Sequence, residues 1–374
     1  MPQDSNLVPV QAAPVSPQRQ MDVGIWIDPI MLEHEAAFVR HLIMGLKGDG
    51  QQVTIIAEAE MDLSALPTLG SRTVTYRHTL LDRGFMGVRR KSPLAQQLAN
   101  DPPDVLLAWG AAPPAPLATL QQSVHLPMVI WCWEVPEFST PLARLPTARH
   151  IVASSHNLAE RAGNSPLPVT IIPPGVYTDE VWSAHDCPDQ PPCLVCLDAL
   201  SDIKSYGPML QACARLSEAG HDFLFFAFDT GKDEHAIWKF AEKLKLLDRI
   251  TFVPYRHNAE NLLLNADFYV HVIPDNRFEY RTLEAMARGL TIVSRPNMAA
   301  DYLLDQQTCR IVPDAGAEAW HQVLLDLLTD RVRAVQLGRR GQQMMRERHG
   351  ITNMITQVTG ICRQSAGIPI PLTG

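Results

Sequence analysis

Glu284 is the residue on which the predicted chemistry of this chain centres. It lies in the segment 276–296, where residues of high helical propensity run up to Gly289, a residue typical of a helix C-cap. Residues 291–293 then read as a short buried strand. Loop, helix, turn and strand in this order form the repeating unit of a doubly wound parallel sheet. In such sheets a helix N-terminus beyond the end of a strand offers N–H groups to phosphate, so we expect Glu284 near an active site.

The elements on either side of this segment predict two Rossmann-like halves. The first half begins with a strand at 21–27, a helix at 35–47 and a strand at 52–57, which is the βαβ order. The second half begins with a strand at 193–197 and continues the same alternation to the segment that contains Glu284. The sequence therefore predicts an α/β protein with two doubly wound parallel sheets.

The run at 283–293, LEAMARGLTIV, resembles the LEAMAxGxPVV signature of the family 4 (group 1) glycosyltransferases. Two more segments match this family in order: 169–176 (VTIIPPGV) is similar to its IPNGV segment, and 266–270 (ADFYV) to its ADxxV strand. The resemblance is weak over 21–150 and good over 151–350. It implies a retaining, nucleotide-sugar-dependent enzyme of the GT-B fold, in which two Rossmann-like domains face a cleft.

The resemblance also places the domain boundaries. In this family the first domain binds the acceptor, the second binds the nucleotide of the donor, and a terminal helix packs back across the first domain. The predicted parts are a disordered leader at 1–20, an acceptor-side domain at 21–180, a linker at 181–192, a donor-nucleotide domain at 193–350 and a returning C-terminal helix at 351–374.

For the donor site, the resemblance points to the start of the second domain and to the helix of Glu284. Lys204 matches the Lys of the GRLSxxKG segment that grips the donor diphosphate, but Ala199 stands where that segment has Arg. A guanidinium binds a pyrophosphate through two hydrogen bonds, and Ala cannot. Glu284 matches the Glu that contacts the donor ribose. The N–H groups near Thr282 and Leu283 are expected to face the phosphates.

The predicted catalytic residues depart further from the family pattern than the donor-site residues do. Asn276, eight residues before Glu284, occupies the place of the Glu that contacts the transferred sugar in the family. An amide carries no charge to stabilise a cationic transition state, and Glu279 is the nearest carboxylate, so both residues remain candidates. Glu134 follows the predicted strand at 128–133, where many family members have a His. A Glu there can orient a sugar hydroxyl or act as a base.

Composition and charge exclude several classes of protein. A net charge of −8 argues against a broad nucleic-acid surface, and the longest apolar runs are too short to span a bilayer. Seven irregularly spaced Cys without a secretory signal favour a reducing cytoplasm. Cys193 and Cys196 are spaced like a metal pair, but Cys196 sits in a predicted core strand, so we predict no metal. The basic segment 82–91 is read either as a solvated loop or as a peripheral contact at the inner membrane face.

Two functions remain open from the sequence. The first is metal-independent, retaining transfer of a sugar from a nucleotide-diphosphate sugar to a saccharide, lipid-linked or protein acceptor, which needs no bound cofactor. The second is a catalytically degenerate protein of the same fold that serves as a sugar-binding or partner subunit. The transferase is the leading interpretation, and the second is supported by the loss of the family's Arg at Ala199, its Glu at Asn276 and its strand-end His. The LEAMARG run argues against a third class, a GT-B-shaped isomerase or hydrolase such as a nucleotide-sugar epimerase. Donor sugar, base, acceptor and oligomeric state stay open.

Overall fold

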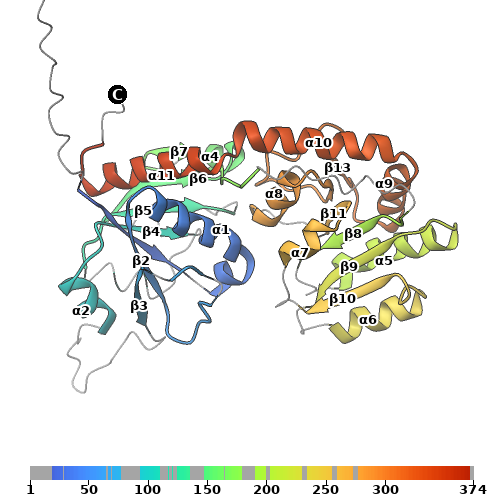
Figure 1. The fold of residues 1–374 in the computed structure, drawn as a ribbon, viewed down its shortest axis with the longest axis horizontal. Coiled ribbons are helices and arrows are strands. Elements are labelled where there is room, and N and C mark those ends of the chain that lie inside the picture. The colour runs from blue at the N-terminus through green and yellow to red at the C-terminus, as the bar shows by residue number, and fades with distance from the viewer. Residues whose placement is uncertain are drawn as a thin grey trace, which may run out of the picture.

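The computed structural model of the chain shows two lobes, each built on a parallel sheet with helices on its faces (Figure 1). It describes residues 19–370 with gaps at 28, 65, 69, 77–92, 110–116, 118–119, 121–123, 135–146, 164, 179–189, 199–202, 230–233, 255–258 and 273–276. The predicted basic segment and most of the predicted leader and linker lie outside the described residues. Within the described part, no helix has the length and apolar character needed to cross a bilayer. The predicted α/β class with two doubly wound domains is confirmed.

The first domain contains a seven-stranded parallel sheet in the order β3-β2-β1-β4-β5-β6-β7. Its strands are β1 (Asp22–Trp26), β2 (Gln52–Glu58), β3 (Arg72–Tyr76), β4 (Val105–Trp109), β5 (Met128–Cys132), β6 (Ala148–Ala153) and β7 (Val169–Ile171), and its described helices are α1 (Pro29–Gly48), α2 (Pro93–Asn100) and α4 (His156–Ala162). The central strands β4 and β5 are buried along their whole length, because helices cover both faces of the sheet.

The second domain contains a six-stranded parallel sheet in the order β10-β9-β8-β11-β12-β13. Its strands are β8 (Cys193–Cys196), β9 (Leu224–Asp229), β10 (Ile250–Pro254), β11 (Phe268–His271), β12 (Thr291–Ser294) and β13 (Cys309–Ile311). Its helices are α5 (Ile203–Glu218), α6 (Glu234–Lys243), α7 (Ala259–Leu264), α8 (Tyr280–Ala287), α9 (Ala317–Thr329) and α10 (Arg331–Arg348). The strand order reverses between β8 and β11, and ligands of doubly wound sheets bind at such a switch point, beyond the carboxyl ends of the strands.

The turn that ends α8 is held by two glycines. Gly289 adopts a left-handed conformation with φ +78°, and the Leu290 N–H donates back to the Ala285 carbonyl at 3.1 Å, so α8 ends where the sequence predicts. Gly338 of α10 packs directly on this turn: a Cβ atom at Gly338 would lie 2.1 Å from the Gly289 carbonyl oxygen. This close approach of two backbones positions α8 against α10.

The chain crosses between the domains twice, and the two crossings lie side by side. The Val176 N–H donates to the His349 carbonyl at 2.8 Å, and His349 Nδ1 lies 2.9 Å from the Pro174 carbonyl oxygen. A Cβ at Gly175 would lie 2.5 Å from the Cα of Ile351, so only glycine fits there. After the second crossing, the last helix, α11 (Ile351–Ala366), lies against the first domain, in line with α10 (Figure 1).

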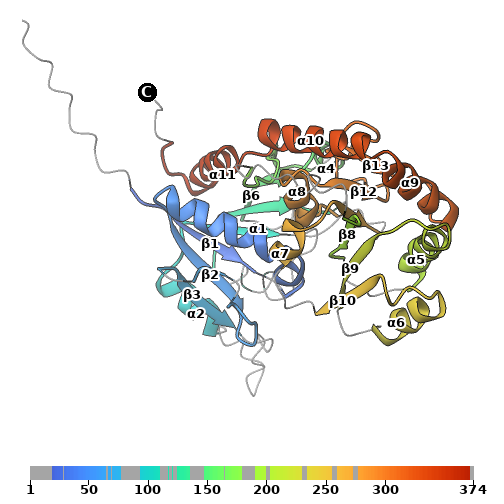
Figure 2. The ribbon, with the colours of Figure 1, turned by 45° about the vertical axis from the view of Figure 1, so that its right-hand side comes forward.

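The two domains share one apolar core where α1 and α8 face each other (Figure 2). Phe38 of α1 packs on Trp133 and on Tyr280 of α8, with ring centroids 4.4 and 5.3 Å apart, and Trp133 packs on Phe278 at 5.3 Å. The Tyr280 hydroxyl donates to the Gly175 carbonyl at 2.7 Å and lies 2.8 Å from His41 Nδ1. The boundary is therefore packed like a protein interior at this point.

Tyr280→Phe should weaken this boundary. The ring packing remains, but the hydrogen bonds to Gly175 and His41 are lost and buried polar groups lose their partner, which costs about 1–3 kcal/mol. We expect a lower urea midpoint together with a larger radius of gyration by X-ray scattering. Tyr206→Phe is the control, since its buried hydroxyl donates to the Asp198 carbonyl at 2.9 Å inside the second domain. It should lower stability without changing the dimensions; equal dimensions for both variants would contradict the interpretation.

Candidate active site

The carboxyl ends of β8 and β11 are tied together by two buried hydrogen bonds to Asp198. Asp198, just after β8, accepts a hydrogen bond from His271 Nδ1 at the end of β11 (2.8 Å) and one from the Val272 N–H (2.7 Å). Asp198 and His271 are both buried. The switch point therefore has a rigid base from which the following loops and helices start.

Helix α8 points its N-terminus at this edge of the sheet. Glu279 is its N-cap residue, and the Glu279 side chain does not cap the helix. The N–H groups from Glu279 to Thr282 therefore have no partner inside the helix. Of the two predicted N–H donors, Thr282 belongs to this turn. Leu283 lies one residue beyond this turn, and its side chain is fully buried in the core.

The predicted donor residues stand on the two helices that flank the switch point. Lys204 lies, exposed, in the first turn of α5, which follows β8. Glu284 lies in the second turn of α8, which follows β11, and only 4% of it is exposed. Burial raises the pKa of the Tyr280 phenol, and the nearby charge of Glu284 raises it further. Ala199 lies outside the described residues.

Glu35 of α1 is a site residue that sequence reasoning missed. The sequence predicts the helix from residue 35, whereas α1 begins at Pro29 and is kinked at Glu35 (φ −121°, ψ 24°). The kink lets the Glu35 carboxylate reach the second domain: Oε2 accepts from the Tyr280 N–H at 3.3 Å, and Oε1 lies 3.6 Å from an Arg277 nitrogen. The sequence does contain one sign of its role: Glu35 lies on the apolar face of the helix, together with Phe38, and a carboxylate is unusual on such a face.

The environment of Glu35 disfavours its charge. Only 3% of the residue is exposed, and burial, followed by the nearby carboxylate of Glu279, raises its pKa to about 8. The guanidinium groups of Arg277 and Arg281 oppose this shift. Glu35 is therefore protonated in most molecules at neutral pH and ionised at alkaline pH.

The segment before α8 also meets the end of β5. Glu134 and Arg277 form an antiparallel β-bridge, and the Phe278 N–H donates to the Trp133 carbonyl. Glu134 itself is exposed. The structure thus brings Glu134 and Glu279 to the same part of the boundary, around Arg277, together with Glu35. Asn276 lies outside the described residues.

Cys193 and Cys196 do not form a pair. They stand three residues apart on β8, so their side chains point to opposite faces of the sheet, and each packs in a different core. Burial raises the pKa of Cys193 to about 12 and that of Cys196 well above its ordinary value. These thiols are positioned as core residues.

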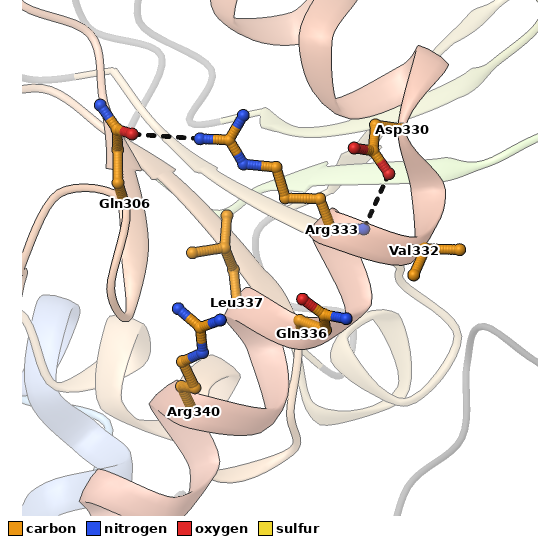
Figure 3. Close-up of a pocket in the computed structure, with 7 residues that line it drawn as sticks. All are labelled: Gln306, Asp330, Val332, Arg333, Gln336, Leu337 and Arg340. Carbon is orange, nitrogen blue, oxygen red and sulfur yellow. Dashed lines mark hydrogen bonds between the residues drawn. The ribbon is translucent and has the colours of Figure 1, made fainter.

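A surface pocket lies at the opposite edge of the second sheet. It is lined by Gln306 and the start of α10, where Arg333 donates to the Gln306 side chain at 3.1 Å (Figure 3). Arg331, at the start of the same helix, is paired with Asp267 at the amino end of β11 (3.3 Å). Because ligands of such sheets bind at the carboxyl ends of the strands, this pocket is not a candidate for the donor.

Comparison with known proteins agrees with this architecture. Residues 180–344 match the family model of the glycosyl transferases group 1. A search of curated proteins returned no match. Among solved structures, a glycosyltransferase from Rickettsia africae is 13% identical, with a TM-score of 0.71, covering 93% of this chain and 99% of its own.

Two further structures have the same fold over their whole length. Anabaena Alr3699/HepE in complex with UDP-glucose is 13% identical (TM-score 0.70; 92% of this chain, 100% of its own). WaaG, a glycosyltransferase involved in lipopolysaccharide biosynthesis, is 15% identical (TM-score 0.64; 91% of this chain, 99% of its own). The chain has the GT-B fold. Residues 180–344 are similar to the glycosyl transferases group 1, the family that the LEAMARG run resembles.

Proposed function

We propose that the protein transfers a sugar from a nucleotide-diphosphate donor to an acceptor hydroxyl. The observation that carries the proposal is the N-terminus of α8, which opens at the switch point between β8 and β11 and faces the other domain. The aligned peptide dipoles and open N–H groups of a helix N-terminus attract phosphate. Lys204 on the neighbouring α5 adds a positive charge on the same side.

The proposed reaction is a retaining transfer without a metal ion. The bond from the sugar C1 to the phosphate oxygen breaks, and its electron pair leaves with the diphosphate. The acceptor oxygen forms the new bond on the same face of C1, and its proton passes to the departing phosphate oxygen. Positive charge at the diphosphate favours this departure. Glu279, Asn276 and Glu134 are the proposed groups for orienting the sugar and stabilising positive charge at C1.

Relatives support a narrower assignment of the substrates. Alr3699/HepE was solved with UDP-glucose, which supports a UDP-sugar as donor. WaaG acts in lipopolysaccharide biosynthesis, which supports a lipid-linked saccharide as acceptor ahead of a protein. We propose both for this chain.

A second function is favoured by one specific contact. The Glu35 carboxyl group occupies the Tyr280 N–H at the N-terminus of α8, where an anionic donor would bind. Together with Ala199 and Asn276, this contact supports a degenerate GT-B protein that binds a sugar or a partner enzyme instead of catalysing transfer. The two proposals differ in whether a nucleotide binds.

Calorimetric titration separates them. UDP, ADP, GDP and their sugar conjugates are titrated without added metal, and binding of one diphosphate is expected for the transferase. Lys204→Ala should weaken that binding about tenfold, as expected for loss of one charge-assisted contact. Lys243→Ala, at the far end of α6, is the matched control and should change nothing. No binding by folded protein favours the degenerate function; unchanged affinity in Lys204→Ala removes Lys204 from the site.

A further inference from the structure

The side chain of Arg281, in the first turn of α8, contacts the ends of the strands β8 and β9. Its Nη1 donates to the carbonyl of Leu197, the residue that follows β8, at 2.8 Å. Its guanidinium carbon lies 5.6 Å from the centre of the Phe228 ring near the end of β9. Arg281 therefore places a half-buried cation over the carboxyl ends of two adjacent strands, on the donor side of the switch point.

The charge of Arg281 acts on titratable groups of both domains. Burial raises the pKa of the Tyr269 phenol on β11, and the positive charge of Arg281 opposes that shift. Arg281 likewise opposes the shift of Glu35, which lies at the N-terminus of α8. The guanidinium thus acts on groups from both domains that border the proposed donor site.

The contacts of Arg281 also fix the orientation of its guanidinium. Its Nη1 donates to a backbone carbonyl, and its guanidinium carbon lies over the ring of Phe228. A planar guanidinium held in this way suits the paired oxygens of a phosphate better than a Lys does. We infer that Arg281 is the guanidinium that binds the donor diphosphate, next to the N-terminus of α8. This inference rests on the proposed function.

The sequence offers no guanidinium at the position that the resembled family uses. The segment similar to GRLSxxKG has Ala199 where the family has Arg. Arg281 brings a guanidinium from α8 to the carbonyl of Leu197, at the end of β8.

The test compares each diphosphate with its nucleoside: UDP with uridine, ADP with adenosine and GDP with guanosine, by calorimetry without metal. Arg281→Ala should weaken diphosphate binding about 10- to 100-fold and leave nucleoside affinity within about twofold. Arg281→Lys keeps the charge but not the planar set of N–H donors, so its diphosphate affinity should lie between those of the wild type and Arg281→Ala. In the double variant, Ala199→Arg should restore the diphosphate affinity lost in Arg281→Ala by about tenfold or more. Arg215→Ala, the same charge change at the end of α5, is the control.

The outcomes separate the two proposals. If the wild type binds no diphosphate, the proposed function fails and the inference falls with it. If the wild type binds and Arg281→Ala keeps the full preference for diphosphate over nucleoside, only the inference is overturned. An equal loss for diphosphate and nucleoside, with a lowered melting temperature and no recovery by Ala199→Arg, shows a purely structural Arg281 and also overturns it.

Discussion

Gly338→Ala is expected to destabilise the protein by about 3 kcal/mol. The new Cβ would lie 2.1 Å from the Gly289 oxygen and 3.1 Å from its carbonyl carbon. Both are backbone atoms, and Gly289 is held at φ +78° in the turn that ends α8, so the clash moves a whole helix rather than one side chain. Urea unfolding followed by circular dichroism measures the loss.

The matched control is another helical glycine. Gly360 lies in α11, and a Cβ there would meet nothing within 4 Å. Gly360→Ala should therefore stabilise the protein by about 0.5–1 kcal/mol, because alanine restricts the unfolded chain. If both substitutions shift the midpoint in the same direction by similar amounts, the close packing of α8 on α10 is not what makes Gly338 necessary.

Glu35→Gln is expected to remove much of the alkaline sensitivity of the protein. The pKa of Glu35 is raised by burial from 4.5 to about 8, so the folded state holds a proton that the unfolded state releases. The stability that this proton provides is complete below about pH 4.5, declines as the pH rises, and is lost once the pH passes about 8. Glutamine keeps the shape and an acceptor for the Tyr280 N–H without ionising.

We therefore expect the wild type to lose at least about 2 kcal/mol more than Glu35→Gln between pH 5 and pH 9, since each pKa unit is worth about 1.4 kcal/mol. Thermal melting of both proteins over this range gives the difference. Glu218→Gln, on the exposed end of α5, controls for the loss of a carboxylate. Parallel pH profiles for wild type and Glu35→Gln would show that Glu35 does not titrate in this range.

The sequence predicts most of the second domain because its signals are local. Short apolar strands alternate with helices, and Gly289 ends α8 by a backbone requirement that is visible in the residue type. The edge strand β3 was not predicted. Its sequence RTVTY is half polar, and only its pairing with β2 makes it a strand. An edge strand of this kind carries little apolar signal of its own.

The candidate site was predicted less completely because its groups come from separate segments. Lys204 and Glu284 could be proposed from the sequence because each lies within a recognisable run, and their roles stay predictions. Glu35 and Arg281 could not be proposed in this way, because the contacts that single them out cross the domain boundary and the sheet. A comparison of single positions finds an Ala at 199, whereas the fold brings the guanidinium of Arg281 from α8 to the carbonyl of Leu197.

The adjacent crossings at Val176 and His349 have a consequence for how the chain is assembled. The first domain is made of residues before the first crossing and of α11 after the second, so the second domain is an insertion whose two ends lie a hydrogen bond apart. Inserts with neighbouring ends can be exchanged without disturbing their host. The second domain could thus be exchanged for another, provided that the replacement presents apolar side chains where Phe278 and Tyr280 meet Trp133 and Phe38.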